Sequence, residues 1–281
     1  MRSDAALDFY RRHGPLSDPG RHAPALAGLS PNVHALAEFV RGLLIHGDWL
    51  ELYGLSNADF PGASRSTLPV AERFDALLAI DPSALTEPRA ARHRSVGTCR
   101  DDALMLCALL RATSVPARVR CGFANYFEPN RYEDHWVCEY WDAGDKRWAL
   151  ADAQLDAEHC HCLGVRFDTT NLPTGTFVNA AEAWRLFETR AIAGDAFGHG
   201  DATGAWFLRV NLERDLRALR KQEISDWDSW REALPSQRML NSESTVRCHT
   251  IAAAISMIDT DYPRFQRKAS ALCENEAPFW Q

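Results

Sequence analysis

The sequence predicts an α+β fold, in which a buried helix that starts at a cysteine is combined with antiparallel strands. Residues 100–112 are apolar on nearly every side, which is typical of a helix buried in a larger core. Residues 135–142 and 146–152 are β-like, and the Asp-Ala-Gly-Asp between them is typical of a hairpin turn. After residue 200 the patterns are helical, which predicts a helical C-terminal extension.

The remaining elements follow from periodicity and from residues that favour helix ends. A helix is expected from Ser30-Pro31 through His46, because proline is favoured at the first helical position. Further helices are expected at 4–13, 70–80, 178–190, 206–222, 226–233 and 242–258, a strand at 116–124, and loops at 56–69 and 198–204. We expect two domains, a core of 1–200 with a helical N-terminal part and a helical extension of 201–281 that packs on it.

Four polar residues fall close together in the expected helix 206–222: Arg209, Asn211, Arg214 and Asp215. Charges on a helix usually form a solvated or salt-bridged face. We therefore prefer that interpretation to a substrate site.

Cys99 stands at the start of the buried helix. Unpaired backbone N–H groups at a helix N-terminus lower the pKa of a thiol and can bind an oxyanion. Asp101 and Asp102 suit a helix N-terminus but discourage a thiolate. The helix alone is therefore not expected to activate the thiol, and a nearby imidazole is needed.

His135 and Asp152 share the predicted hairpin. If the turn is centred between Ala143 and Gly144, Glu139 faces Trp148 and His135 faces Asp152. Directly opposed residues have Cβ atoms about 4.5–5.5 Å apart, which suits a carboxylate that orients an imidazole. A register one residue different would send Asp152 to the opposite face.

About sixty residues, 94–155, resemble the transglutaminase-like core. The cysteine segment reads GTCRDDALMLCALLRATSVPARVRCGFA, the histidine strand HWVCEYW and the aspartate strand WALAD. The resemblance implies a papain-like α+β fold, with the cysteine helix packed on an antiparallel sheet, and a catalytic triad of Cys99, His135 and Asp152. Trp136 and Ala153-Gln154 depart from the family pattern beside the site, which makes Trp136 and Gln154 candidate substrate-binding residues.

The backbone N–H of Cys99 is one natural oxyanion donor. Papain-like proteases often use a glutamine upstream of the nucleophile, but the first glutamine of this chain is Gln154. Trp49 and Tyr53 carry suitable N–H and O–H groups, although a packing role is at least as plausible for each. They complete the candidate substrate-binding set.

The cluster His159-Cys160-His161-Cys162 has the residue types of a metal site. In a strand, however, the two histidines would point away from the two cysteines. We expect a loop or strand here, with no metal and no cofactor. A metal-dependent hydrolase that uses this cluster is a third hypothesis.

Composition limits the function classes. The chain has 281 residues and a net charge of −7, which gives no electrostatic support for nucleic-acid binding. No apolar run approaches the length of a membrane span, and the first residues lack a signal-peptide pattern, so we expect a cytoplasmic protein without a membrane partner. Its eight cysteines are then expected to be reduced, with Cys107, Cys121 and Cys138 as small buried hydrophobic residues.

The leading hypothesis is a thiol enzyme of acyl transfer or hydrolysis. Cys99 attacks an amide, ester or thioester carbonyl of a small metabolite or peptide, His135 acts as the base, and Asp152 orients His135. The alternative is a transglutaminase-like binding module without turnover. The acceptor, the substrate and the oligomeric state stay open at this point.

Overall fold

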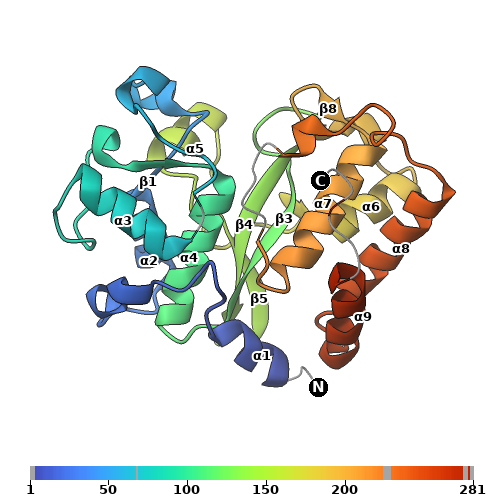
Figure 1. The fold of residues 1–281 in the computed structure, drawn as a ribbon, viewed down its shortest axis with the longest axis horizontal. Coiled ribbons are helices and arrows are strands. Elements are labelled where there is room, and N and C mark those ends of the chain that lie inside the picture. The colour runs from blue at the N-terminus through green and yellow to red at the C-terminus, as the bar shows by residue number, and fades with distance from the viewer. Residues whose placement is uncertain (1–3, 68, 224–228, 275–277, 279–281) are drawn as a thin grey trace. The chain divides into compact units, whose positions relative to one another are not determined.

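A computed structural model describes residues 4–67, 69–223, 229–274 and 278 (Figure 1). The chain forms two compact units, each built from segments far apart in the sequence. We call residues 8–119 and 136–173 the cysteine unit, and the described residues of 1–7, 120–135 and 174–281 the C-terminal unit. Helices and an antiparallel hairpin are both present, which confirms the α+β class.

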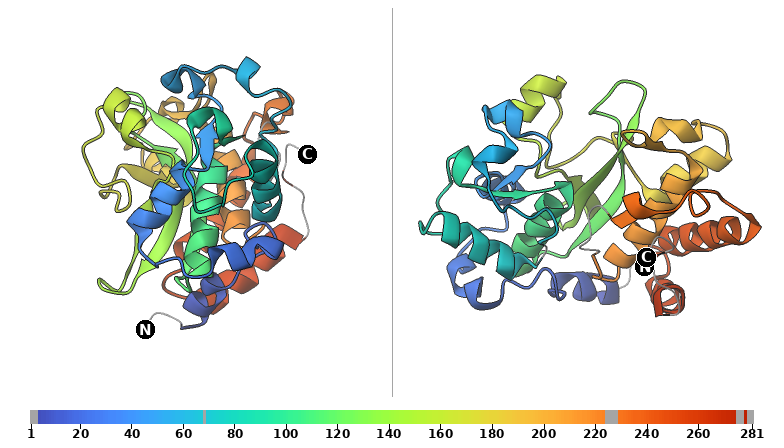
Figure 2. Two further views of the ribbon diagram at one scale, coloured as in Figure 1. Left: turned by 90° about the vertical axis from the view of Figure 1, so that its left-hand side faces the viewer. Right: turned by 45° about the horizontal axis from the view of Figure 1, so that its top comes forward.

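The cysteine unit is built around α4 (Cys99–Ala112), in which every side chain from Cys99 to Arg111 is buried. This helix contacts α2 (Val33–Arg41), α3 (Val70–Ile80) and the parallel pair of β1 (Leu44–His46) and β2 (Ser95–Gly97) (Figure 2). Because it is covered from several sides, α4 is apolar nearly all round, as the sequence predicts. The unit also contains the short helices η1 (Gly20–Leu26), η2 (Leu50–Tyr53), η3 (Asn57–Asp59) and η4 (Ala91–His93).

The expected helix at 30–46 is wrong at both ends. The side chain of Asn32 accepts a hydrogen bond from Ala35 N at 3.0 Å, so this residue caps α2 and the helix starts after Pro31. The helix ends at Arg41, and residues 44–46 form β1 instead. The partner of β1 lies about fifty residues further along the chain, and a local pattern does not reveal such pairing.

Local signals were sufficient for several other elements. The helices expected at 4–13, 70–80 and 100–112 are confirmed as α1 (Asp4–Arg11), α3 and α4, and the strand expected at 116–124 as β3 (Ala117–Ala124). The hairpin is confirmed as β4 (Tyr132–Asp142) and β5 (Arg147–Ala151). Strand β4 passes from the C-terminal unit into the cysteine unit directly after His135.

The strands of the C-terminal unit follow the order β6-β3-β4-β7-β8. Strand β6 (Phe177–Asn179) is antiparallel to β3, while β7 (Phe197–His199) is parallel to β4 and antiparallel to β8 (Ala202–Thr203). The glycine-rich stretch 198–204 was expected to be a loop, and that prediction is wrong. A Cβ atom on Gly198 would lie 2.2 Å from the carbonyl oxygen of Ala202, so this glycine is required by a tight hairpin.

Four helices of this unit pack against one another in Figure 1: α6 (Ala180–Glu188), α7 (Ala205–Ala218), α8 (Ser242–Ser256) and α9 (Tyr262–Glu274). The first three were expected. The sequence missed α9, which buries only a narrow stripe of Tyr262, Phe265 and Ala269. Within 226–233, residues 229–232 form the short helix η6 (Ser229–Glu232), and residues 226–228 lie outside the described part of the chain.

Asn211, Arg214 and Asp215 of α7 are buried and Arg209 is half-buried, so of the two expected alternatives the salt-bridged face is formed and the solvated face is not. Asp215 is 0% exposed and accepts hydrogen bonds from Arg120 Nε and from Cys121 N, both at 3.0 Å. Arg214 donates to Asp134 at 3.0 Å. The salt bridges are therefore internal, and they fasten α7 to β3 and β4. Buried charges persist only when they are paired in this way.

Further sequence expectations can be placed on this fold. Cys107, Cys121 and Cys138 are 0% exposed, which confirms them as buried residues, and all eight cysteines are free. No helix in the described part of the chain is long and apolar enough to cross a membrane. The division into domains of 1–200 and 201–281 stays a prediction. The two compact units are interleaved along the chain, so they do not test it.

Candidate active site

Cys99 is the first residue of α4, and a capping box fixes its position. The carboxylate of Asp101 accepts hydrogen bonds from Thr98 N at 2.7 Å and from Thr98 Oγ1 at 3.1 Å. Gly97 is required just before this turn, because a Cβ atom there would lie 2.9 Å from the Cβ of Asp101. Strand β2, the cap and the helix together hold the Cys99 backbone N–H at a helix N-terminus, where it suits an oxyanion.

A buried arginine changes the electrostatics of this helix start. Arg73 Nη2 lies 2.7 Å from Asp101 Oδ1, and both side chains are almost completely buried. The pair neutralises one of the two carboxylates that were expected to oppose a thiolate at Cys99. The sequence gives no local signal for this contact, because it joins α3 to α4.

Asp152 directly follows β5 and is 1% exposed. Its backbone N–H donates to Thr169 O at 2.7 Å, and its carbonyl oxygen accepts from Arg41 Nη2 at 3.2 Å. Its Oδ1 accepts the backbone N–H of Gln154 at 3.0 Å. The backbone of Asp152 is thus fastened on both sides, which fixes the direction of the carboxylate.

His135 lies on β4 in the C-terminal unit and is 2% exposed. The rings of Phe127 and Tyr126 pack on its imidazole, with centroid distances of 4.8 and 5.9 Å. The preceding Asp134 accepts hydrogen bonds from Asn211 Nδ2 at 2.9 Å and from Arg214 at 3.0 Å. Burial raises the pKa of Asp134, but the Arg214 charge and the other interactions outweigh it and the net pKa is lowered. Asp134 is therefore ionised, and its hydrogen bonds hold strand β4 in place at the residue before His135.

The register predicted for the hairpin is wrong by two residues. Glu139 pairs with Leu150 and Cys138 with Ala151, so Glu139 does not face Trp148. The connection is longer than expected because Asp142 Oδ1 accepts the N–H groups of Gly144 and Asp145, at 2.9 and 3.2 Å. Since the shift is even, each residue stays on the sheet face that the sequence predicts. His135 and Asp152 are not directly opposed, because the register that pairs Cys138 with Ala151 would place Val137 opposite Asp152.

Trp136, a candidate substrate-binding residue, is 1% exposed. Its side chain therefore belongs to the core. A contact with substrate stays a prediction for this residue.

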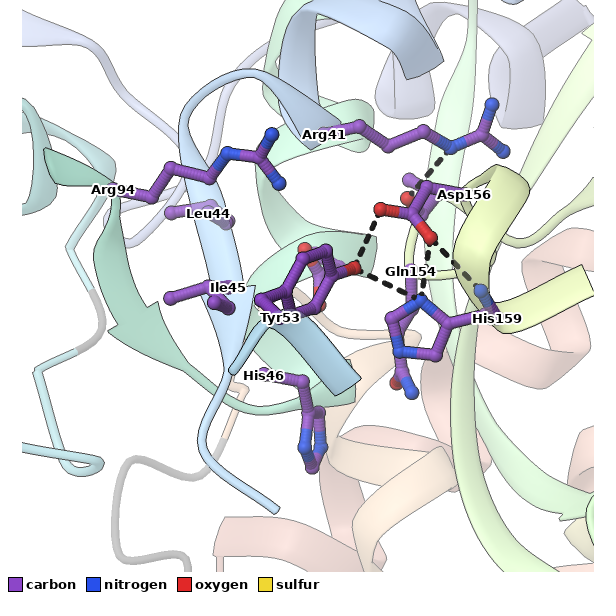
Figure 3. A pocket seen from close by; sticks show the side chains of 11 residues that line it. Arg41, Leu44, Ile45, His46, Tyr53, Arg94, Gln154, Asp156 and His159 are labelled. Atoms are coloured by element: carbon purple, nitrogen blue, oxygen red, sulfur yellow. Dashed lines mark hydrogen bonds and ion pairs between the residues drawn. The ribbon is translucent and has the colours of Figure 1, made fainter. Parts of the chain in front are cut away.

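Tyr53 and Trp49 both contact His159, which the sequence analysis considered only as part of a candidate metal cluster. The hydroxyl of Tyr53 donates to Asp156 Oδ2 at 2.5 Å and lies 3.2 Å from His159 Nδ1 (Figure 3). The ring of Trp49 packs on the His159 ring with a centroid distance of 5.1 Å. Burial and then the Asp156 carboxylate raise the pKa of Tyr53, so its hydroxyl keeps its proton and stays committed to Asp156.

The cluster 159–162 is helical, so the expected loop or strand is wrong. These residues lie on α5 (Ala157–Leu163), which Asp156 caps by accepting the N–H of His159 at 3.0 Å. Helical spacing buries His159 and leaves His161 and Cys162 exposed. Among the residues that the structure describes, no group of three or more His, Cys, Asp or Glu side chains is arranged to hold a metal ion.

Comparison with known proteins identifies the cysteine segment. Residues 56–153 match the family model described as the transglutaminase-like superfamily, and this range includes Cys99, His135 and Asp152. No curated protein matches the chain. A solved structure, the "Putative Cysteine Protease" from Cytophaga hutchinsonii, is similar at 17% identity with a TM-score of 0.39, covering 63% of this chain and 46% of that one. This chain thus spans less than half the length of that protein. The match of residues 56–153 to this family model agrees with the resemblance that the sequence of 94–155 shows.

Proposed function

We propose that the chain is a Cys–His–Asp thiol enzyme that catalyses acyl transfer or hydrolysis at an amide, ester or thioester carbonyl. The observation that carries this proposal is the position of Cys99, held by a capping box at the first residue of a buried helix within the superfamily segment. A structural cysteine needs no such placement, whereas a nucleophile gains from the helix N-terminus. The substrate is a small metabolite or peptide. Neither a nucleic acid nor a membrane is proposed as a partner.

In the proposed reaction, the sulfur of Cys99 bonds to the carbonyl carbon while His135 takes the thiol proton. The developing oxyanion is stabilised by the backbone N–H of Cys99. The bond to the leaving group breaks, His135 returns the proton to that group, and a thioester remains on Cys99. Asp152 orients the His135 ring throughout. Water or an amine then accepts the acyl group.

Two features of the cysteine unit support these roles. The Arg73–Asp101 ion pair removes one carboxylate charge that would oppose a thiolate at Cys99. The hydrogen bonds of Asp152 to Thr169 and Gln154 hold that carboxyl group in one place, as an orienting residue requires.

The proposal is tested by incubating the protein with small amide, ester and thioester substrates and trapping the acyl-enzyme by mass spectrometry. We expect one acyl group on the peptide that contains Cys99. Cys162→Ala is the matched control, because it removes an exposed thiol and should leave the adduct unchanged. Acylation only at Cys162, or no adduct while ligands still bind, would support the binding module instead.

A further inference from the structure

The cysteine unit contains a small polar cavity beside the helix that starts at Cys99. About 10 Å³ is open to the centre of a water-sized molecule, which is room for roughly one water. The polar side chains on its wall include Tyr53, Arg94, Asp102, Gln154, Asp156 and His159 (Figure 3). All of them belong to the same compact unit.

Asp156 sets the direction of the hydrogen bonds in this cavity. It accepts from the Tyr53 hydroxyl at 2.5 Å and from His159 Nδ1 at 2.8 Å. Burial raises the pKa of Asp156, but the hydrogen bonds from His159 and Tyr53 outweigh it and the net pKa is lowered. The ionised carboxylate only accepts, so the hydrogen of the His159 ring sits on Nδ1. In the neutral ring Nε2 then presents a lone pair.

Two acceptors on the cavity wall lack a hydrogen-bond partner within the part of the chain that the structure describes. His159 is 2% exposed and Gln154 is 6% exposed. No described residue provides a hydrogen-bond partner for His159 Nε2 or Gln154 Oε1. Buried acceptors are costly when unpaired, so a buried pair on one wall indicates a ligand that donates hydrogen bonds to both.

The surroundings define the chemistry of that ligand. Arg41 also borders the cavity, but its guanidinium forms an ion pair with Glu38 at 2.5 Å and donates a hydrogen bond to the carbonyl oxygen of Asp152 at 3.2 Å. The guanidinium of Arg94 lies over the Tyr53 ring, 5.7 Å from its centroid. The acceptors on this wall that lack a partner among the described residues are therefore His159 Nε2 and Gln154 Oε1, beside a space for roughly one water-sized group. A water molecule or the nitrogen of a primary amine fits, since both carry at least two hydrogens.

The cavity is also bordered by residues close in sequence to Cys99 and to Asp152. Asp102 stands one helical turn after Cys99, and side chains at this spacing have Cβ atoms about 5–6 Å apart. Gln154 stands two residues after Asp152 and donates its N–H to that carboxylate.

On the basis of the thiol-enzyme function above, we propose that this cavity is the acceptor subsite, in which His159 Nε2 and Gln154 Oε1 hold the water or primary amine that receives the acyl group from Cys99. The oxygen or nitrogen of the acceptor bonds to the thioester carbon, and the carbon–sulfur bond breaks. The acceptor proton passes to His159 Nε2 and then to solvent. The sulfur leaves as a thiolate. Asp156 orients the His159 ring, as a carboxylate does in a base–orienter pair.

The test separates acylation from deacylation with p-nitrophenyl acetate. In the wild type, the initial burst of p-nitrophenol reports acylation of Cys99, and the steady-state rate reports release of the acetyl group from Cys99. We expect His159→Gln to keep the burst, to lower the steady-state rate about 10²-fold, and to accumulate acetylated Cys99. His161→Gln is the matched control, since it changes an exposed histidine of the same helix. If His159→Gln does not fold, Gln154→Leu removes the other acceptor and should also slow release without reducing the burst.

Methylamine distinguishes the two sources of the acceptor. Formation of N-methylacetamide by the wild type, reduced in His159→Gln, identifies an amine subsite. Release of acetate alone, with the same His159 dependence, identifies a water subsite. Unchanged release in both the His159 and Gln154 variants, or equal losses of burst and release, would overturn the acceptor role. Absence of any wild-type burst and of any Cys99 adduct would overturn the thiol-enzyme function as well.

Discussion

The guanidinium of Arg73 lies 2.7 Å from the carboxylate of Asp101, and the two side chains are only 4% and 2% exposed. The same guanidinium donates to Ser95 Oγ at 3.1 Å and to Val96 O at 2.6 Å, in the strand that leads to Cys99. Asp101 in turn accepts the N–H of Thr98. One buried ion pair therefore joins α3, β2 and the first turn of the helix that carries the proposed nucleophile.

The first prediction concerns the stability of this junction. Arg73→Met leaves the Asp101 charge buried without its partner, so we expect the free energy of unfolding to fall by about 3–5 kcal/mol. Urea denaturation at pH 7 measures it. Arg65→Met is the control, because it removes a more exposed pair with Asp48 and should cost at most about 1 kcal/mol. Equal losses in the two variants would contradict a structural role for the Arg73 pair.

The second prediction concerns thiol reactivity. Iodoacetamide at low dose and neutral pH should label Cys99 before Cys107, Cys121 and Cys138, because thiolate character and exposure control alkylation. Cys99 is 8% exposed and stands at a helix N-terminus, whereas the other three are 0% exposed. Burial, and then the neighbouring Cys107 thiol, raise the pKa of Cys138. Peptide mapping gives the order, and the exposed Cys162 reports the rate of an ordinary surface thiol. Cys99 among the slowest sites would count against a nucleophile.

The elements that were predicted well are those specified by neighbouring residues. Helix α3 covers 70–80 as expected, and α4 starts at the predicted cysteine because Thr98 and Asp101 form a local cap. The hairpin was placed correctly but its register was not. Turn residues indicate that a connection exists, whereas its length depended on Asp142 capping two N–H groups and on Lys146 adopting a φ of 53°.

The parts that were missed depend on contacts between distant segments. Strand β1 exists because it pairs with β2, and Asp101 is neutralised by an arginine from another helix. The Asp156–His159 pair was missed because 159–162 was interpreted as a strand or loop. A signal was present, since aspartate three residues before His159 is a favourable helix cap. No pattern in the local sequence predicts that Tyr53 contacts the Asp156–His159 pair.

The third prediction is a pH dependence of stability. His199 Nδ1 lies 2.6 Å from Glu133 Oε1, and this hydrogen bond, against burial, raises the pKa of His199 above 6.5. The folded pKa then exceeds the unfolded one, so the stabilisation is complete below pH 6.5 and is lost as pH rises through the folded pKa. We expect His199→Gln to cost up to about 1 kcal/mol at pH 5.5 and less at pH 9.

Urea denaturation of both proteins at the two pH values measures this difference. The exposed His161→Gln is the control and should change the unfolding free energy by less than about 0.5 kcal/mol at either pH. A cost for His199→Gln that stays constant or grows towards pH 9 would show that the ion pair is not the source of the stabilisation.

The last prediction separates an enzyme from a binding module through mutant kinetics, measured on a substrate found by adduct trapping. Cys99→Ala should abolish covalent turnover, because it removes the nucleophile. His135→Ala should lower kcat by about 10³-fold or more, because the thiol loses its base. Asp152→Ala should cost less, since the imidazole keeps its chemistry and loses only its orientation. In a unit that acts together these losses do not add, so removing both Cys99 and His135 should be little worse than removing Cys99 alone.

Cys107→Ala is the control for core packing, and it should lower the melting temperature while the turnover of folded protein stays unchanged. Full activity in Cys99→Ala, or a double variant far below Cys99→Ala, would be incompatible with a Cys–His–Asp thiol enzyme.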